Sequence, residues 1–139
     1  MYRLLIILFL LVFYQGFLKA EIVKKIEILG NQRVSNETIK AYGDINANKD
    51  YSEQDLNKIL TNLYSTNFFE DVKVKLSNGV LIVQVKEYPV INDLIILGEK
   101  SKKYKDKVLE LISLKQKDSF IENRLAKDIE IIKKLYASA

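Results

Sequence analysis

The residues of this chain that could do chemistry are its carboxylates and lysines, because the sequence contains no histidine and no cysteine. It therefore lacks the commonest metal ligands and the Ser-His and Cys-His pairs of nucleophilic catalysis, and it can form no disulfide. Glu70 and Asp71 form an adjacent carboxylate pair. Neighbouring residues of a strand point to opposite faces of a sheet, so these two carboxylates do not converge on one substrate atom. We predict a binding protein that is not an enzyme and uses no cofactor and no metal.

The charge of the chain argues against a nucleic-acid partner. Twenty-two basic and 18 acidic residues leave a formal net charge of +4. Two of the basic residues, Arg3 and Lys19, lie in a segment that we expect to be removed, so the remainder is nearly balanced. A nucleic-acid interface typically shows a basic stripe with interleaved aromatic residues. We therefore expect no nucleic acid among the partners.

The first 20 residues have the pattern of a signal peptide. Arg3 supplies a positive start, and Leu4–Tyr14 is an unbroken apolar run. A membrane-spanning helix needs about 20 apolar residues, whereas a run half as long is typical of the apolar region of a signal peptide. We expect cleavage after Ala20, which places the mature chain outside the cytoplasm. An uncleaved anchor that extends to Leu18 is the alternative.

Residues 21–88 predict one small α+β domain. The β-branched run 22–29 favours a strand, and Ser35 and Ser52 are good N-caps for two helices that follow it. Val72–Leu76 then alternates between apolar and lysine side chains, which is typical of a strand with one solvated face. Asn78-Gly79 indicates a hairpin. The returning strand Val80–Lys86 is apolar on both faces until Gln84, which favours the middle of the sheet. The predicted order is β-α-α-β-β: a three-stranded mixed sheet covered by two helices, with Val72–Leu76 at an edge.

The same unit begins again after Pro89, the only proline. Ile26-x-Ile28-Leu29-Gly30 returns 68 residues later as Leu94-x-Ile96-Leu97-Gly98. A first helix around Val108 and a capping box at Ser119-x-x-Glu122 follow. We expect residues 89–139 to be an incomplete second copy, β-α-α only. One strand with two helices does not close a sheet, so we also expect the sequence to be part of a longer polypeptide.

Three segments carry a resemblance to a known family. They are the turn Gly30–Val34 (GNQRV), the helix-to-strand junction Leu63–Val74 (LYSTNFFEDVKV) and the strand end Val83–Pro89 (VQVKEYP). In this order they resemble POTRA domains of the BamA (Omp85) family. Asn67 stands where the family usually has glycine, and asparagine tolerates the left-handed conformation of such a turn. Glu99 replaces the asparagine expected after Gly98, which makes the second copy less similar to the family.

The resemblance implies a scaffold in the periplasm of a Gram-negative bacterium. Such domains receive unfolded outer-membrane proteins, often from a periplasmic chaperone, and work with other subunits of an assembly complex. They pass the client to a carboxy-terminal barrel in the outer membrane, and no such barrel is present in this sequence. The alternatives are a POTRA domain of a related secretion transporter or of a membrane-anchored cell-division protein.

The candidate partner-binding residues are those of the expected edge strand: Val72, Lys73, Val74, Lys75 and Leu76. An edge strand can accept an extended peptide through its unpaired backbone groups. Lys73 and Lys75 are equally the residue type that protects an edge from aggregation. We expect Tyr88 and Pro89 to form the interdomain joint. At least one ring of Phe68-Phe69 is expected in the core.

Overall fold

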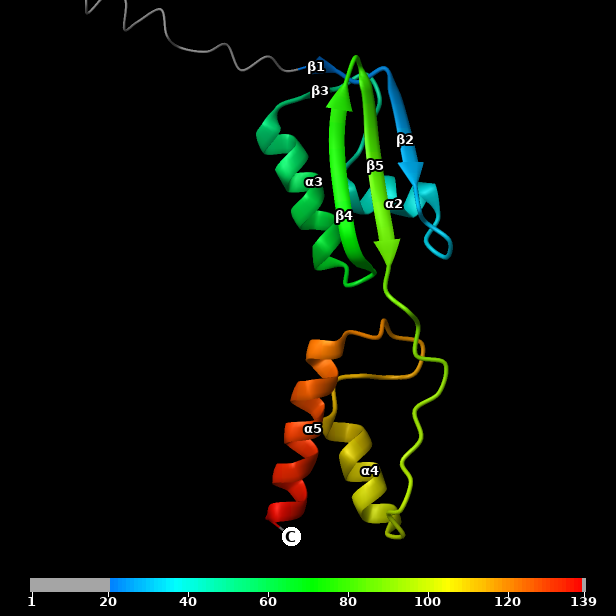
Figure 1. Ribbon diagram of the computed structural model, residues 1–139, viewed down its shortest axis with the longest axis vertical. Helices are drawn as coiled ribbons and strands as arrows, with labels where there is room; N and C mark the ends of the chain where they lie inside the picture. The colour runs from blue at the N-terminus through cyan, green and yellow to red at the C-terminus, as the bar shows by residue number, and fades with distance from the viewer. Residues whose placement is uncertain (1–20, 139) are drawn as a thin grey trace, which may run out of the picture.

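The computed structural model describes residues 21–138, so the predicted signal peptide and its cleavage after Ala20 lie outside the described residues. Figure 1 shows a first unit with a sheet and helices, followed by a long connection and further helices. No helix within residues 21–138 has the length and apolar character needed to cross a membrane. The elements run β1 (Glu21–Ile22), β2 (Lys25–Leu29), α2 (Asn36–Gly43), β3 (Asp50–Tyr51), α3 (Glu53–Ser65), β4 (Phe69–Ser77), β5 (Val80–Glu87), α4 (Lys102–Leu111) and α5 (Glu122–Ala137).

The main sheet has three strands in the order β2-β5-β4, which confirms the predicted mixed α+β arrangement. β5 lies in the middle, parallel to β2 and antiparallel to β4. The β4–β5 turn uses Asn78 and Gly79 at φ 54° and 75°, as an Asn-Gly hairpin requires. Leu81, Val83 and Val85 of β5 are at most 4% exposed and pack in the core with residues from α2 and α3. Burial of this strand thus holds the sheet to its helices.

The amino-terminal strand is shorter than the run 22–29 predicts. Val23 is fully buried and its N–H donates to Lys49 O, whereas Ile22 is 55% exposed. The chain therefore first pairs with β3 in a two-stranded sheet. The chain then turns at Lys24 and Lys25, whose N–H groups both donate to Gly79 O. Periodicity alone missed this small sheet because each of its strands has only two residues.

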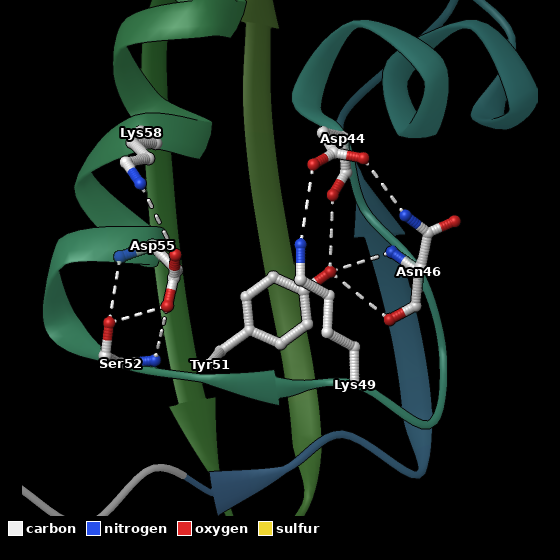
Figure 2. A network of polar contacts seen from close by, with 7 residues as sticks. All are labelled: Asp44, Asn46, Lys49, Tyr51, Ser52, Asp55 and Lys58. Atoms are coloured by element: carbon white, nitrogen blue, oxygen red, sulfur yellow. Dashed lines mark hydrogen bonds and ion pairs between the residues drawn. The ribbon is translucent and has the colours of Figure 1, made fainter.

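Local hydrogen bonds fix the start of α3 and the loop before it (Figure 2). Ser52 Oγ accepts from Asp55 N, and Asp55 Oδ2 accepts from Ser52 N at 3.0 Å, so the predicted N-cap is part of a full capping box. Tyr51 Oη accepts from Asn46 N at 2.8 Å and closes the loop. At the end of α2 the left-handed residue is Asp44 (φ 52°). A Cβ on Gly43 would lie 2.7 Å from Ile45 Cδ1, so a larger residue there would require the buried Ile45 side chain to shift.

The second unit differs from its prediction in two places. Residues 94–97 are extended but form no strand, because no ladder partner lies beside them within residues 21–138. The predicted capping box at Ser119 is also wrong: α5 begins at Glu122 after Ile121, with no side-chain cap. Ser119 is buried and instead forms a β-bridge with Val90. The β-bridge between Ser119 and Val90 therefore replaces the N-cap that the sequence pattern predicts.

Candidate functional site

The predicted edge Val72–Leu76 lies in β4, which has β5 as its only strand partner in the described chain. The Val72 side chain is buried, and those of Val74 and Leu76 pack partly against the core. Lys73 and Lys75 are exposed on the opposite face. β4 thus combines an apolar inner face, a cationic outer face and a lateral edge of backbone groups.

One backbone group of this edge is already occupied. Val72 N donates to Tyr64 Oη at 3.1 Å, and Tyr64 Oη lies 3.4 Å from Asp71 Oδ1. Because backbone groups alternate sides along a strand, the N–H groups of Val74 and Leu76 point the same way as that of Val72, away from β5. The edge is therefore open from Val74 to Leu76 and covered by Tyr64 at Val72. Sequence reasoning missed Tyr64, which reaches β4 from the last turn of α3.

Glu87 holds the Gly30–Val34 turn to the end of β5. Its Oε1 accepts from the N–H groups of Gln32, Arg33 and Val34 at 2.9, 3.0 and 2.9 Å, and Arg33 Nε lies 3.5 Å from Oε2. Burial acts to raise the pKa of Glu87, but the three N–H groups and the Arg33 side chain outweigh it, so this pKa lies below its ordinary value. No local pattern could reveal this contact, because it spans 53 to 55 residues.

Gly30 makes the same junction sterically tight. It adopts φ +85°, and a Cβ at this position would lie 2.2 Å from Val85 O. Only glycine lets the turn approach β5 so closely. The end of β5 and the Gly30–Val34 turn are therefore in close contact where the chain leaves the first unit.

Tyr88 and Pro89 lie at this exit, where the joint was predicted. Tyr88 N donates to Phe68 O at 2.9 Å and extends the ladder, while Pro89 O accepts from Phe120 N at 2.7 Å. Ile91 N donates to the carbonyl of Asp118, and Ile91 O accepts from Lys117 N. Residues 117–120 thus bind residues 89–91 through backbone groups, and we call this contact the strap. The strap thus ties the start of the second unit to the loop before α5.

The two remaining residue pairs considered in the sequence are Phe68-Phe69 and Glu70-Asp71. Phe69 is 2% exposed, which confirms a core ring, and Phe68 contacts Tyr42 and Phe69 edge to face. Glu70 pairs with Lys86 at 2.7 Å, whereas Asp71 pairs with Lys73 at 3.4 Å, so the two carboxylates face different partners. Within residues 21–138 no group of three or more His, Cys, Asp or Glu side chains could hold a metal ion.

Comparison with known proteins identifies relatives of this chain. Residues 21–88 match the family model "POTRA: Surface antigen variable number repeat". The outer membrane protein assembly factor BamA of Neorickettsia risticii (strain Illinois) is 31% identical over 101 residues, which cover 71% of this chain and 14% of that protein. BamA of Neisseria meningitidis serogroup B (strain ATCC BAA-335 / MC58) is 33% identical over 78 residues, 56% of this chain and 10% of that protein. The chain thus spans about a seventh or less of these relatives.

Two solved structures share the fold. The amino-terminal domain of Omp85 from Thermosynechococcus elongatus matches with a TM-score of 0.58 and 16% identity, over 86% of this chain and 52% of that chain. The POTRA1-2 structure of the periplasmic domain of Omp85 from Anabaena matches with a TM-score of 0.52 and 12% identity, over 86% of this chain and 81% of that chain.

Proposed function

Because residues 21–88 form a POTRA domain of the BamA/Omp85 family, we propose that this chain is a non-enzymatic periplasmic scaffold that receives unfolded outer-membrane proteins by strand addition at β4. In this proposal residues 89–138 begin a second POTRA domain, within which the strap joins residues 89–91 to residues 117–120. A periplasmic chaperone and other assembly-complex subunits are the further partners, and the complete protein is anchored in the outer membrane.

The observation that carries the proposal is the edge of β4. Its Val74 and Leu76 amides point away from β5, and β4 has no second strand neighbour among the described residues. An extended client can add to such an edge through main-chain hydrogen bonds, which are tolerant of side-chain identity. This tolerance suits clients of many different sequences.

Strand addition is tested by backbone NMR of the chain during titration with an extended peptide of alternating apolar and polar residues. We expect amide shifts concentrated on Val74–Leu76. The matched control is the same peptide with N-methyl groups on the amides that would face β4, since it keeps the side chains and loses the ladder. Equal binding by both peptides would contradict strand addition. Shifts confined to Lys25–Leu29 would move the site to β2, the other edge.

The Tyr64 contact makes a separate prediction. Tyr64→Phe removes the hydroxyl that occupies Val72 N, and freeing one hydrogen-bonding group for the client is expected to strengthen peptide binding about fivefold, which corresponds to about 1 kcal/mol. Fluorescence anisotropy of a labelled peptide measures the change. Tyr42→Phe is the control, because Tyr42 contacts Phe68 through its ring and lies outside β4. Unchanged binding by the Tyr64 variant would mean that the client does not pair at Val72.

A further inference from the structure

A small cleft opens where the first unit meets the second. It has a volume of about 230 Å³, and its wall from the first unit consists of Arg33 and residues 66–68, which lie between α3 and β4. Its wall from the second unit consists of residues 117–119 and Arg124 of α5. Three side chains in these walls are cationic: Arg33, Lys117 and Arg124. The cleft therefore gathers positive charge from segments that are far apart in the sequence.

Backbone hydrogen bonds connect the two walls through the joint. Phe68 O accepts from Tyr88 N at 2.9 Å, and the neighbouring Pro89 O accepts from Phe120 N at 2.7 Å. Pro89 and Phe120 belong to the strap, which also contains Lys117. The segments that carry the cations are thus connected before any ligand binds, which lowers the ordering cost of binding.

Further hydrogen bonds orient the two arginines. Arg124 donates through Nε and Nη2 to Ser113 Oγ and Ser113 O, at 3.3 and 2.6 Å. Arg33 is held by its backbone N–H, which donates to Glu87 Oε1 at 3.0 Å. Nη1 of Arg124 and both Nη groups of Arg33 make no hydrogen bond within the described part of the chain. Both arginines therefore keep donors for a ligand.

The cleft carries one positive charge more than its neighbours neutralise. Arg33 Nε lies 3.5 Å from Glu87 Oε2, and Arg124 Nη2 lies 3.8 Å from Asp118 Oδ2. Lys117 Nζ, by contrast, forms no ion pair and no hydrogen bond with another described residue. Three cations and two carboxylates leave one positive charge, which Lys117 supplies.

Asn67 adds an uncharged donor to this wall. Its φ is 58°, and its N–H donates to Tyr64 O, so its backbone belongs to the turn after α3. Asn67 lines the cleft, and its side-chain amide makes no hydrogen bond within the described part of the chain. Glycine, which the family resemblance leads us to expect here, allows the same turn without the amide. The donor is therefore a feature of this chain.

The size and charge of the cleft restrict its occupant. Small-molecule sites have volumes of about 300–1,000 Å³, so a cleft of about 230 Å³ suits a single side chain better. Its single surplus charge matches a monovalent anion, and Asp118 in the wall opposes a phosphate dianion more strongly than a carboxylate. One carboxylate on a protein side chain satisfies both conditions.

We propose that this cleft binds the carboxylate of a glutamate or aspartate that a partner protein presents in an exposed acidic segment. Arg33 offers the planar fork that a carboxylate prefers. The side chains of Arg33 and Arg124 are 39% and 32% exposed, so the contact is partly shielded from water and stronger than on an open surface. Phe68 is half-buried in the same cleft and can contact the aliphatic part of the acidic side chain. Binding here is independent of client addition at β4.

The test is an NMR titration of the isotope-labelled chain with the capped peptide acetyl-Gly-Leu-Glu-Leu-Gly-amide. We expect shifts of the Nε–H signals of Arg33 and Arg124 and of the side-chain amide of Asn67. The same peptide with glutamine in place of glutamate keeps the shape and loses the charge. It is expected to bind at least about tenfold more weakly, and added salt should weaken the glutamate peptide.

Lys117→Gln tests the surplus charge. Lysine and glutamine are both unbranched, so the change leaves the backbone at φ 69° with a similar cost. We expect about fivefold weaker binding of the glutamate peptide, because one of its charge partners is lost. Lys103→Gln is the matched control, since it removes the same charge from α4, outside the cleft. Equal affinities of the two variants would refute a role of Lys117.

Asn67→Gly tests the donor that is particular to this chain. Glycine adopts positive φ readily, so the turn is kept while the amide is lost. We expect about threefold weaker binding, in keeping with the loss of one hydrogen bond. Asn48→Gly is the matched control, because Asn48 has a similar φ of 60° and lies outside the cleft.

Four results of the titration would overturn the proposed site. Equal binding of the glutamate and glutamine peptides would show that charge is not recognised. Inorganic phosphate that shifts the same signals at equal or lower concentration would identify a general anion site. Shifts confined to Val74–Leu76 would place the peptide on the β4 edge, which supports the proposed function and refutes the cleft. Shifts that depend on the chain concentration without peptide would show that a second copy of the chain supplies the carboxylate.

Discussion

Replacing Gly30 with alanine is expected to destabilise the first domain by about 3 kcal/mol, the sum of left-handed strain and overpacking. The left-handed backbone costs a side chain about 1–2 kcal/mol, and a Cβ placed 2.2 Å from Val85 O must push the turn and β5 apart. Amide exchange of the β5 residues measures the loss, because these amides report the stability of the sheet.

Gly98→Ala is a matched control for this prediction. Gly98 ends the same sequence motif at φ +84°, but no atom lies within 4 Å of its Cβ position. The variant should therefore lose only the conformational part, about 1 kcal/mol, measured through the amides of α5. Equal losses in the two variants would mean that the approach to Val85 contributes nothing.

Glu87→Gln is expected to cost about 1.5–3 kcal/mol near neutral pH, the range for hydrogen bonds to a charged group. The pKa of Glu87 is lowered in the folded protein, so its contribution is present above the pKa of the unfolded chain. It is lost as the pH falls through the depressed folded value. The stability of the wild type should thus decline in acid while the variant changes less, and the two should converge. Urea unfolding at pH 7 and at pH 3 measures both effects.

Glu70→Gln controls for the loss of a surface charge beside β5. Glu70 and Lys86 form an ion pair at 2.7 Å with side chains 44% and 69% exposed, and exposed pairs contribute about 0–1 kcal/mol. This variant should therefore lie close to the wild type at both pH values. If Glu87→Gln behaves in the same way, the carboxylate does not hold the turn.

The parts of the fold that could be predicted from the sequence are those set by short-range chemistry. Ser52 caps α3 and Asn78-Gly79 forms the hairpin because each needs only neighbours within a few residues. Val80–Glu87 lies in the middle of the sheet, as its apolar character on both faces predicts. The edge position of Val72–Leu76 follows from the same reasoning.

The parts that could not be predicted depend on distant partners. Ser119 has the pattern of an N-cap, yet its pairing with Val90 prevails. Residues 94–97 have the pattern of a strand, but a strand needs a neighbour to exist. At the site, Tyr64 and Glu87 were missed because helix α3 and the Gly30–Val34 turn bring them to their partners. The local periodicity of the sequence does not predict such long-range contacts.

The central place of β5 also dictates an order of assembly. β2 pairs with residues 55 positions later, from Lys25↔Val80 to Leu29↔Gln84, and synthesis proceeds from the amino end. While the ribosome extends the chain, β2, α2 and α3 have no sheet to join until β5 has emerged. The local β4–β5 hairpin then forms within microseconds and captures β2 in a slower, long-range step. The domain therefore stays unfolded until its last strand is made.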